Sequence, residues 1–408
     1  MANETTKIVV LGGGYAGVMA ALRIAGKTKR LNTAVTLISG LDYFVERPRL
    51  HEAATGTVLE GKALPDMLAG SKAQFRQGWV SQLLPEKRQV VVETAGQAQS
   101  IAYDYLVMAL GSRVDRESVN GVNEHAFSLD PFGPRTSQAL AQKLKALDKT
   151  SFRAVVVGGG ATGIEAAAQI KAAHPHSRVT LVTQAEMAAF KGPRIQKHVR
   201  QALAAQDIHL VERQRVTAVT AAGVVLAGGE LAADVIVWAG GFVAPPLAQD
   251  AGLQVNQRKQ VLTDPFLRSL SQPGIYAVGD MAWPVAEPGA PMRMSLFTAL
   301  VSGAQAADNI VAEIKGRPLQ PLSFAWYGQA IALGPEDAVG FATYPADEPI
   351  GPVYRGKTAV TLRNFFVWFL KAALEGERRF PGFLFWNGKK RYGRQQRQRQ
   401  LAKTVTNH

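Results

Sequence analysis

Short runs of apolar residues recur along the 408-residue chain and are separated by longer stretches of mixed composition. The runs at 7–11 (KIVVL) and 153–157 (RAVVV) are apolar at nearly every position, which is typical of parallel strands covered by helices on both faces. A glycine cluster follows each run, and helices are predicted to begin near Tyr15 and to include 164–170. The repeated order of strand, glycine turn and helix predicts an α/β fold with two such units.

The remaining apolar runs indicate how the two units are connected. Strands are predicted at 34–38 and within RQVVVET and YDYLVMALGS in the first unit, and within RVTLVT and DVIVWAGG in the second. A later run, GIYAVGDMA, is expected to return to the first sheet, so the second unit is inserted in the first. The expected bounds are 1–114 and 243–320 for the outer domain, 115–242 for the inserted domain, and 321–408 for a C-terminal region that is helical or α+β.

Both glycine clusters have the form GxGxxG, with Gly12, Gly14 and Gly17 in the first and Gly158, Gly160 and Gly163 in the second. The first glycine permits a tight turn, the second allows backbone to approach a pyrophosphate, and the third allows the helix to pack against its strand. The free N–H groups at each helix start then face the phosphates. The chain is therefore predicted to hold two dinucleotides in two Rossmann-like domains, with Tyr15, Ala16, Ala161 and Thr162 at the starts of the two helices.

The strand ends carry further candidate binding residues. Ala109 and Gly111 follow a predicted buried strand, where small residues permit close approach of a ligand or of backbone. The second strand of a dinucleotide unit usually ends in an acidic residue that binds ribose, but Ser39 and Thr183 stand there. Without a carboxylate at Thr183 the choice between NADH and NADPH stays open, although Glu186 three residues later favours NADH.

Composition excludes several classes of protein. The chain has no cysteine, which rules out a disulfide relay and any thiol chemistry, and its seven histidines show no metal-ligand spacing, so we expect no metal site. No run is long enough to cross a bilayer. Because the first strand begins within a few residues of Met1, a secretory signal is not expected, and we expect a cytoplasmic protein.

Five motifs occur in a specific order: GGGYAG, YDYLVMALGS, GGGATGIE, DVIVWAGGF and GIYAVGD. Over about residues 5 to 315 they resemble the two-dinucleotide-binding flavoprotein family, most closely its type II NADH dehydrogenase group. The resemblance implies FAD in the first domain, NADH or NADPH as substrate in the inserted domain, and hydride transfer between them. It also implies that Asp280 beside Gly279 contacts the ribityl chain, that Val80 contacts the adenine region, and that Gly240 belongs to the nucleotide site.

The helix after the GD segment departs from this group. The stretch 296–302 reads LFTALVS, so that Phe297 and Val301 stand where the group carries glutamines near its quinone pocket. The N-terminus of this helix, at Leu296, is expected to point its positive end at the flavin. Phe297 either packs on a quinone ring or belongs to the core.

Two further sites are predicted from position. Glu165 lies two residues past the second fingerprint, where the family carries a glutamate, and it is our candidate for proton exchange. The alternative is that Glu165 has no chemical role and is favoured there only because the helix dipole stabilises a carboxylate at a helix start. The loop containing Glu46, Arg47 and Arg49 lies where related flavoproteins cover the flavin, so either Arg47 or Arg49 is expected to reach the cofactor, unless both are surface residues.

The end of the chain combines aromatic and basic residues. Residues 371–408 hold 10 Lys or Arg and 2 acidic residues. Their net charge of +8 is more than half of the formal net charge of +14 of the whole chain. This composition suits peripheral contact with the cytoplasmic face of a membrane, with seven aromatic residues in the interface: Phe365, Phe366, Trp368, Phe369, Phe383, Phe385 and Trp386. Packing of the same aromatics on the protein is the alternative. No nucleic-acid module accompanies the basic GRQQRQRQ stretch, so nucleic acid is not an expected partner.

These features predict a flavoprotein NAD(P)H dehydrogenase that passes two electrons to an acceptor. A membrane quinone is the favoured acceptor, and a soluble redox protein or small molecule is the enzymatic alternative. A redox-gated interaction protein resembling apoptosis-inducing factor would use the same two sites, so this function remains an alternative. The sequence is also compatible with a homodimer.

Overall fold

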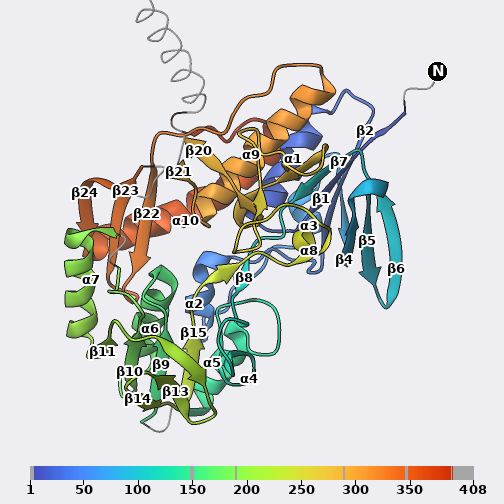
Figure 1. The fold of residues 1–408 in the computed structure, drawn as a ribbon. Helices are drawn as coiled ribbons and strands as arrows, with labels where there is room; N and C mark the ends of the chain where they lie inside the picture. Colours follow the sequence, from blue (N-terminus) through green and yellow to red (C-terminus); the bar gives the residue numbers. More distant parts are fainter. Residues whose placement is uncertain are drawn as a thin grey trace, which may run out of the picture.

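The computed structural model describes residues 4–147, 151–188, 191–287, 290–344, 348–386 and 388. The first domain is built on a five-stranded parallel sheet of order β18-β7-β1-β2-β3. Its strands are β1 (Thr6–Leu11), β2 (Thr33–Ser39), β3 (Ala73–Gln77), β7 (Tyr105–Met108) and β18 (Ile275–Ala277). Because β18 follows the whole second unit in sequence yet pairs with β7, the predicted insertion is confirmed (Figure 1).

Apolar residues on both faces of this sheet are covered. One face packs on α1 (Tyr15–Lys27) and α9 (Leu296–Ile314). The other face packs on an antiparallel sheet and a short helix: β4 (Trp79–Leu84), β5 (Gln89–Thr94), β6 (Gln97–Ala102) and α8 (Leu247–Asp250). The domain also contains the short elements η1 (Arg47–Arg49), α2 (Leu50–Ala53), α3 (Leu64–Leu68), η2 (Pro85–Lys87), β17 (Val261–Leu262), η4 (Gly279–Met281), β19 (Ala282–Trp283), β20 (Val285–Glu287) and β21 (Ala290–Pro291).

The inserted domain repeats the plan with a four-stranded parallel sheet of order β11-β10-β9-β15. Its strands are β9 (Arg153–Val157), β10 (Arg178–Val182), β11 (Ile208–Val211) and β15 (Val235–Trp238). Its other elements are α4 (Val122–His125), α5 (Ser137–Leu147), α6 (Ala161–Ala173), α7 (Pro193–Ala205), β12 (Val216–Val219), β13 (Gly223–Leu226) and β14 (Gly229–Ala232). β8 (Arg113–Val114) and β16 (Phe242–Val243) pair antiparallel where the chain leaves and re-enters the first domain.

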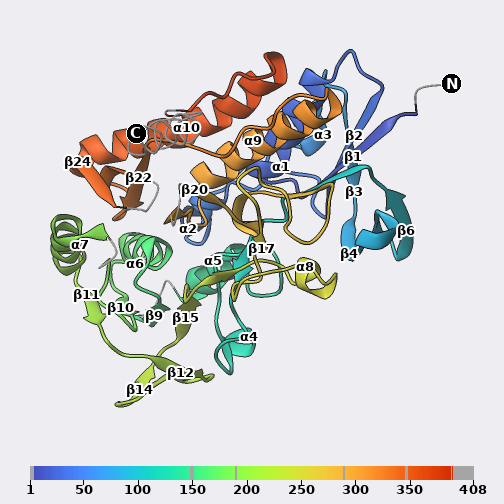
Figure 2. The ribbon, with the colours of Figure 1, turned by 45° about the horizontal axis from the view of Figure 1, so that its top comes forward.

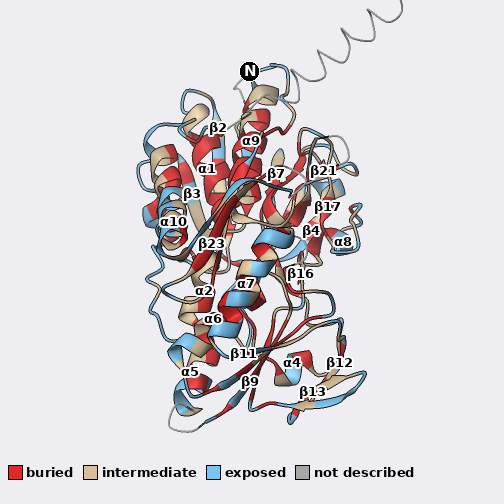
Figure 3. Cartoon of the chain, turned by 90° about the vertical axis from the view of Figure 1, so that its left-hand side faces the viewer, coloured by how far each residue is buried: buried red, intermediate tan, exposed pale blue. Residues whose placement is uncertain are grey.

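The C-terminal region is α+β. β22 (Tyr327–Ala332), β23 (Ala338–Thr343) and β24 (Pro349–Arg355) form an antiparallel sheet that is followed by the long helix α10 (Gly356–Arg379). α1 contacts both α9 and α10, and Figure 2 shows these three helices on the same side of the first sheet. Apolar residues of α2 and of the C-terminal sheet join the core of the inserted domain, so the three parts share buried surface. Figure 3 shows that burial follows α1, α9 and β23, whereas α7 presents an exposed face.

Candidate functional site

The first glycine loop is shaped by backbone contacts that exclude side chains. A Cβ atom added to Gly12 would collide with the carbonyl oxygen of Ala109, and one added to Gly17 would collide with that of Gly12. Gly12 also has φ +108°, a conformation that favours glycine. A Cβ on Gly14 would meet nothing within 4 Å, so the backbone at the start of α1 faces open space. This arrangement fits a bound pyrophosphate beside Gly14.

The second glycine loop has the same geometry. Side chains at Gly158 and Gly163 would collide with the carbonyl oxygens of Ala239 and Gly158, whereas Gly160 faces open space at the start of α6. Ala161 and Thr162, partly exposed, form the first turn of α6 beside Gly160. Both fingerprints are therefore built for a dinucleotide.

Two hydroxyl residues occupy equivalent positions in the two domains. A Cβ on Gly13 would lie 3.0 Å from Ser39 Oγ, and a Cβ on Gly159 would lie 2.5 Å from Thr183 Oγ1. Each hydroxyl therefore lies against its own glycine loop, at the end of the second strand. Neutral side chains stand where a ribose-binding carboxylate is usual.

An ion pair lies beside Thr183. Glu186 accepts hydrogen bonds from Arg213 and from Gln196, and the Arg213 guanidinium holds the pKa of Glu186 below its usual value. Thr183 and Arg213 come close because the Thr183 N–H donates to Val211 O at 2.9 Å, at the end of the neighbouring strand β11. A carboxylate paired with an arginine therefore lies three residues past Thr183.

Asp280, Ser112 and Arg47 come together at the carboxyl ends of the first sheet. The Ser112 hydroxyl donates to Asp280 Oδ2 at 2.7 Å, and Arg47 Nη1 donates to Ser112 O at 2.8 Å. Burial raises the pKa of Asp280, opposed by the Ser112 hydrogen bond and the charge of Arg47. Arg49 points elsewhere and pairs with Glu52 at 2.8 Å, so of the two predicted arginines Arg47 is the one beside Asp280.

Close packing of α1 and α9 positions this aspartate. Gly279, with φ +62°, lies between Ala16 and Ala299, since an added Cβ would be 3.2 and 3.5 Å from atoms of these residues. The Gly279 N–H donates to Ser302 Oγ at 2.8 Å. Ser302, which sequence reasoning did not single out, therefore fixes the turn that presents Asp280.

The start of α9 lies beside the Asp280 carboxyl, which accepts a hydrogen bond from the backbone of Ser295. Ser295 caps the helix by accepting a hydrogen bond from Thr298 N at 3.2 Å. Leu296 and Phe297 are partly buried against the core of the first domain. Phe297 stacks on Tyr327 with ring centroids 4.8 Å apart and meets Phe324 edge-on, so it belongs to an aromatic cluster that joins α9 to the C-terminal region.

Tyr15, the first residue of α1, carries a buried hydroxyl for which the described residues provide no hydrogen-bond partner. Its ring meets Phe44 edge-on at 4.6 Å, and burial raises the pKa of the phenol. Tyr15 directly follows the glycine loop in sequence, and an unsatisfied buried polar atom is what a bound cofactor would pair with. Tyr15 thereby adds to the fit of a flavin nucleotide in the first domain.

The other predicted contacts lie at the edges of the two sites. Val80 is partly buried in β4 and pairs with Val92 of β5. Gly111 has φ +73° and no neighbour that would obstruct a Cβ. A Cβ on Gly240 would come within 2.7 Å of the Trp238 ring, so glycine is required for this turn to fold over the indole.

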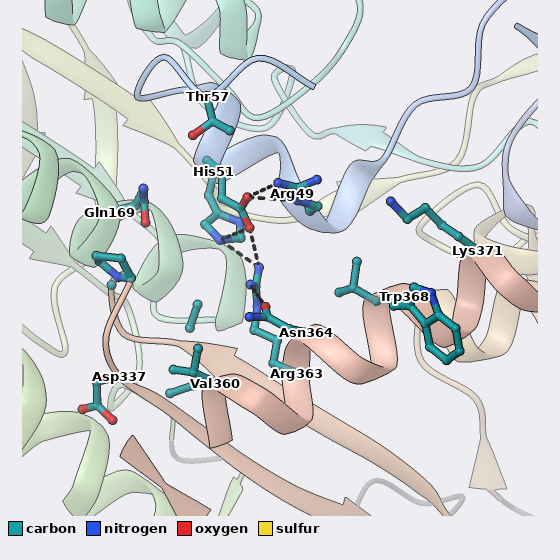
Figure 4. A pocket seen from close by; sticks show the side chains of 16 residues that line it. Arg49, His51, Thr57, Gln169, Asp337, Val360, Arg363, Asn364, Trp368 and Lys371 are labelled. Atoms are coloured by element: carbon teal, nitrogen blue, oxygen red, sulfur yellow. Dashed lines mark hydrogen bonds and ion pairs between the residues drawn. The ribbon is translucent and has the colours of Figure 1, made fainter. Parts of the chain in front are cut away.

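Glu165 is half-buried on the first turns of α6, and its Oε1 accepts a hydrogen bond from Ala332 N at 3.1 Å. Ala332 lines a pocket of about 480 Å³ that is enclosed by α2, α6, the β22–β23 turn and α10 (Figure 4). The predicted proton-exchange residue therefore contacts the backbone of a residue that lines this pocket, and the same hydrogen bond ties it to the C-terminal sheet.

His51 and Arg363 meet inside this pocket. Arg363 Nη2 lies 3.2 Å from His51 Nε2 and donates to Glu52 at 3.0 Å (Figure 4). Arginine has no acceptor, so Nε2 must accept and the imidazole is neutral with its proton on Nδ1. Burial lowers the pKa of His51, partly offset by the carboxylate of Glu165. The sequence alone does not reveal this partner, because Arg363 is 312 residues away from His51 along the chain.

The C-terminal aromatics divide into exposed and packed residues. Phe365, Trp368, Phe369, Phe383 and Phe385 are exposed, and Phe366 is half-buried against Gly328. Trp386 is only 4% exposed and its indole N–H donates to Ser323 O at 2.7 Å, so its expected place in a membrane interface is wrong. The Ser323 carbonyl oxygen accepts the hydrogen bond of the indole N–H, and the hydrocarbon of a lipid would provide no such acceptor. The GRQQRQRQ stretch lies outside the described residues.

Within the described ranges, no helix is long and apolar enough to span a membrane. The same ranges contain no group of three or more His, Asp or Glu side chains placed to hold a metal ion.

Comparison with known proteins places these features in a family. The chain is 28% identical over 354 residues to the demethylphylloquinone reductase NdbB of Synechocystis sp., covering 83% of this chain and 87% of that protein. It is 26% identical to a type II NADH:quinone oxidoreductase of Haemophilus influenzae, covering 90% and 92%. The structure of NDH2 from Plasmodium falciparum in complex with NADH has the same fold, with a TM-score of 0.74, 16% identity and coverage of 94% and 100%.

A model of the pyridine nucleotide-disulphide oxidoreductase family matches residues 6–306, well over half of the chain. The family name refers to a disulfide that this chain cannot form, because it has no cysteine. The chain nevertheless carries both dinucleotide loops in the family's order, and it belongs to the pyridine nucleotide-disulphide oxidoreductase family as an oxidoreductase that uses FAD and a nicotinamide nucleotide.

Proposed function

We propose that this protein oxidises NADH through FAD and passes the electrons to a quinone at a membrane surface. The observation that carries this proposal is the group of exposed aromatic side chains near the C-terminal end, in a chain without the cysteines that a disulfide acceptor would need. The names of the relatives, which act on quinones, support the same acceptor.

In this proposal the residues of the first domain hold FAD. The free N–H groups at the start of α1 bind the pyrophosphate next to Gly14, and Asp280 binds a hydroxyl of the ribityl chain. Arg47 and Ser112 keep the Asp280 carboxylate in place. FAD, when bound, supplies the chemistry of taking a hydride from the nicotinamide and releasing two electrons.

In the inserted domain, the start of α6 binds the pyrophosphate of NADH next to Gly160. Thr183 bonds the adenosine ribose, and the nearby Glu186 disfavours the extra phosphate of NADPH. NADH is therefore the proposed donor.

Glu165 is the proposed proton carrier. Reduction of a quinone to a quinol by NADH consumes one proton from the medium in addition to the hydride. The Glu165 carboxyl group is held by its hydrogen bond to the backbone N–H of Ala332, a residue that lines the pocket, and exchanges that proton with solvent from this position.

The C-terminal region provides the proposed membrane contact. Phe365, Trp368 and Phe369 lie within two turns of α10 and are exposed, and Lys and Arg residues follow them along the chain. Exposed aromatics with nearby bases suit the interface of an anionic bilayer.

The test is stopped-flow reoxidation of protein reduced anaerobically with one equivalent of NADH. We expect a ubiquinone analogue to reoxidise the flavin absorbance at least tenfold faster than dissolved oxygen does, as an order-of-magnitude criterion. Reoxidation no faster than by oxygen would exclude the quinone.

One observation favours a soluble acceptor as the second candidate. Phe297 and Val301 stand where the quinone-reducing group carries glutamines. The Phe297 ring also stacks on Tyr327, so one of its faces is already covered. In the same experiment, rapid reoxidation by a soluble one-electron acceptor with none by the quinone would support this candidate. A reduced state that outlasts both for minutes in air would instead support the redox-gated alternative.

A further inference from the structure

Two exposed aromatic side chains from distant parts of the chain meet at one corner of the first domain. Trp79, the first residue of β4, is 56% exposed, and Phe132, in the loop before α5, is 40% exposed. Their ring centroids are 5.4 Å apart with an interplanar angle of 74°. Large aromatics are usually buried, so a pair that protrudes together needs a reason.

The corner lies at the end of β2, where a dinucleotide places its adenosine ribose. Ser39 ends β2 and contacts the first glycine loop, and Gly40 follows it. A Cβ on Gly40 would come within 2.5 Å of the Trp79 indole, so the ring lies directly against this backbone. The Gly78 N–H donates to Ser39 O at 2.9 Å and holds the start of β4 at the same corner.

Phe132 is presented by an anchored loop. The neighbouring Asp130 accepts a hydrogen bond from Val114 N at 2.8 Å, and its main-chain oxygen accepts one from Ser137 N. Arg47 Nη2 lies 3.5 Å from the same carboxylate, which links the loop to the residue beside Asp280. The loop that carries Phe132 is therefore tied to the first domain on two sides.

We propose that Trp79 and Phe132 form an aromatic wall for the adenine of FAD, and that this wall selects the dinucleotide over flavins that lack adenosine. The inference rests on binding of FAD by the first domain and concerns two residues that neither the fingerprint nor the strand pattern singles out. The exposed part of the indole offers a flat surface to a flat base, and the T-shaped contact with Phe132 holds the indole in its orientation. In this proposal Trp79 is a binding residue for the adenine, and Phe132 is a positioning residue that acts through the indole.

The test compares apoprotein variants in their binding of FAD and of FMN, which lacks the adenosine. We expect Trp79→Ala to raise the Kd for FAD roughly tenfold, as stacking of one base on one aromatic side chain suggests, and to leave the Kd for FMN unchanged. Phe132→Ala is expected to raise the FAD Kd by roughly threefold because it acts through the indole, and Trp79→Phe is expected to recover part of the affinity. Trp326→Ala removes another exposed tryptophan and serves as the matched control.

A second readout reports the contact itself. An FAD analogue with a fluorescent etheno-adenine is expected to lose its adenine emission on binding to the wild type and to keep more of it in Trp79→Ala. Equal FAD affinity in the wild type and Trp79→Ala, or an equal loss for FAD and FMN, would overturn the proposal. Neither result bears on whether NADH reduces the flavin or quinone reoxidises it. Those two reactions are measured separately on FAD-saturated protein, so failure of this inference is distinguishable from failure of the proposed function.

Discussion

A single carboxylate next to Thr183 is expected to decide which nicotinamide nucleotide the inserted domain accepts. The second strand ends in a hydroxyl in both domains, and in the inserted one Glu186 reaches the same corner while paired with Arg213. This pair resists a 2′-phosphate because the carboxylate both repels it and neutralises the guanidinium that would attract it.

We predict that Glu186→Gln raises kcat/KM for NADPH roughly tenfold and leaves kcat/KM for NADH nearly unchanged. The substitution keeps the size of the side chain and frees Arg213 to bind phosphate. Steady-state kinetics with both donors and a fixed acceptor provide the measurement, with Glu230→Gln in β14 as an exposed control. An unchanged ratio of the two kcat/KM values would show that donor choice lies elsewhere.

The contact between α1 and the C-terminal end of α10 depends on a buried group of charges. Arg23 of α1 is 1% exposed, binds Asp308 of α9 at 2.8 Å and binds the fully buried Glu377 of α10 at 3.1 Å. Glu377 in turn accepts a hydrogen bond from Leu384 N at 3.0 Å, which folds the segment after α10 back on the domain. One arginine thus joins three helices and the chain that follows them.

Replacement of Arg23 by methionine is expected to lower the free energy of unfolding by about 3–5 kcal/mol, because it leaves the Glu377 carboxylate buried without its cation. Lys27→Met is the control, since Lys27 also pairs with Asp308 but is 28% exposed and should cost less. Urea unfolding followed by circular dichroism measures both. If the additional Glu377→Gln substitution recovers none of the loss, the explanation by an unpaired buried charge is incorrect.

For the molecule as a whole, membrane attachment is expected to depend on the exposed face of α10. We predict that the triple variant Phe365→Ser, Trp368→Ser and Phe369→Ser lowers binding to vesicles of anionic phospholipid at least tenfold, because three aromatic side chains leave the interface. Cosedimentation with anionic and with zwitterionic vesicles separates the aromatic from the basic contribution. Equal sedimentation of the wild type and the triple variant would place the contact elsewhere, and NADH reduction of the flavin in both proteins shows that the fold is kept.

Local pattern was sufficient for the order of elements and for the two nucleotide loops. Buried parallel strands are apolar at nearly every position, so a short stretch of sequence is enough to predict β1 and β9. A turn in which a Cβ atom would collide with a carbonyl oxygen accepts only glycine, so a short stretch also identifies Gly12 and Gly158. A short window also predicted the helix that begins at Tyr15, whereas the return of β18 to the first sheet was inferred from the order of the apolar runs along the whole chain.

Contacts between residues far apart in the chain followed only from the tertiary structure. Arg363 meets His51, Ala332 holds Glu165, and Ser323 gives Trp386 the partner that removes it from the surface. The periodicity of apolar residues shows which face of a helix or strand points inward. It does not show which other element packs against that face. The amino-acid sequence therefore determined that this protein has two dinucleotide-binding loops, because the conformation of a tight turn is a local property. The partners of its charged and aromatic side chains were decided by packing between α1, α2, α6, α9 and α10, because burial and ion pairing depend on the neighbours that the whole fold supplies.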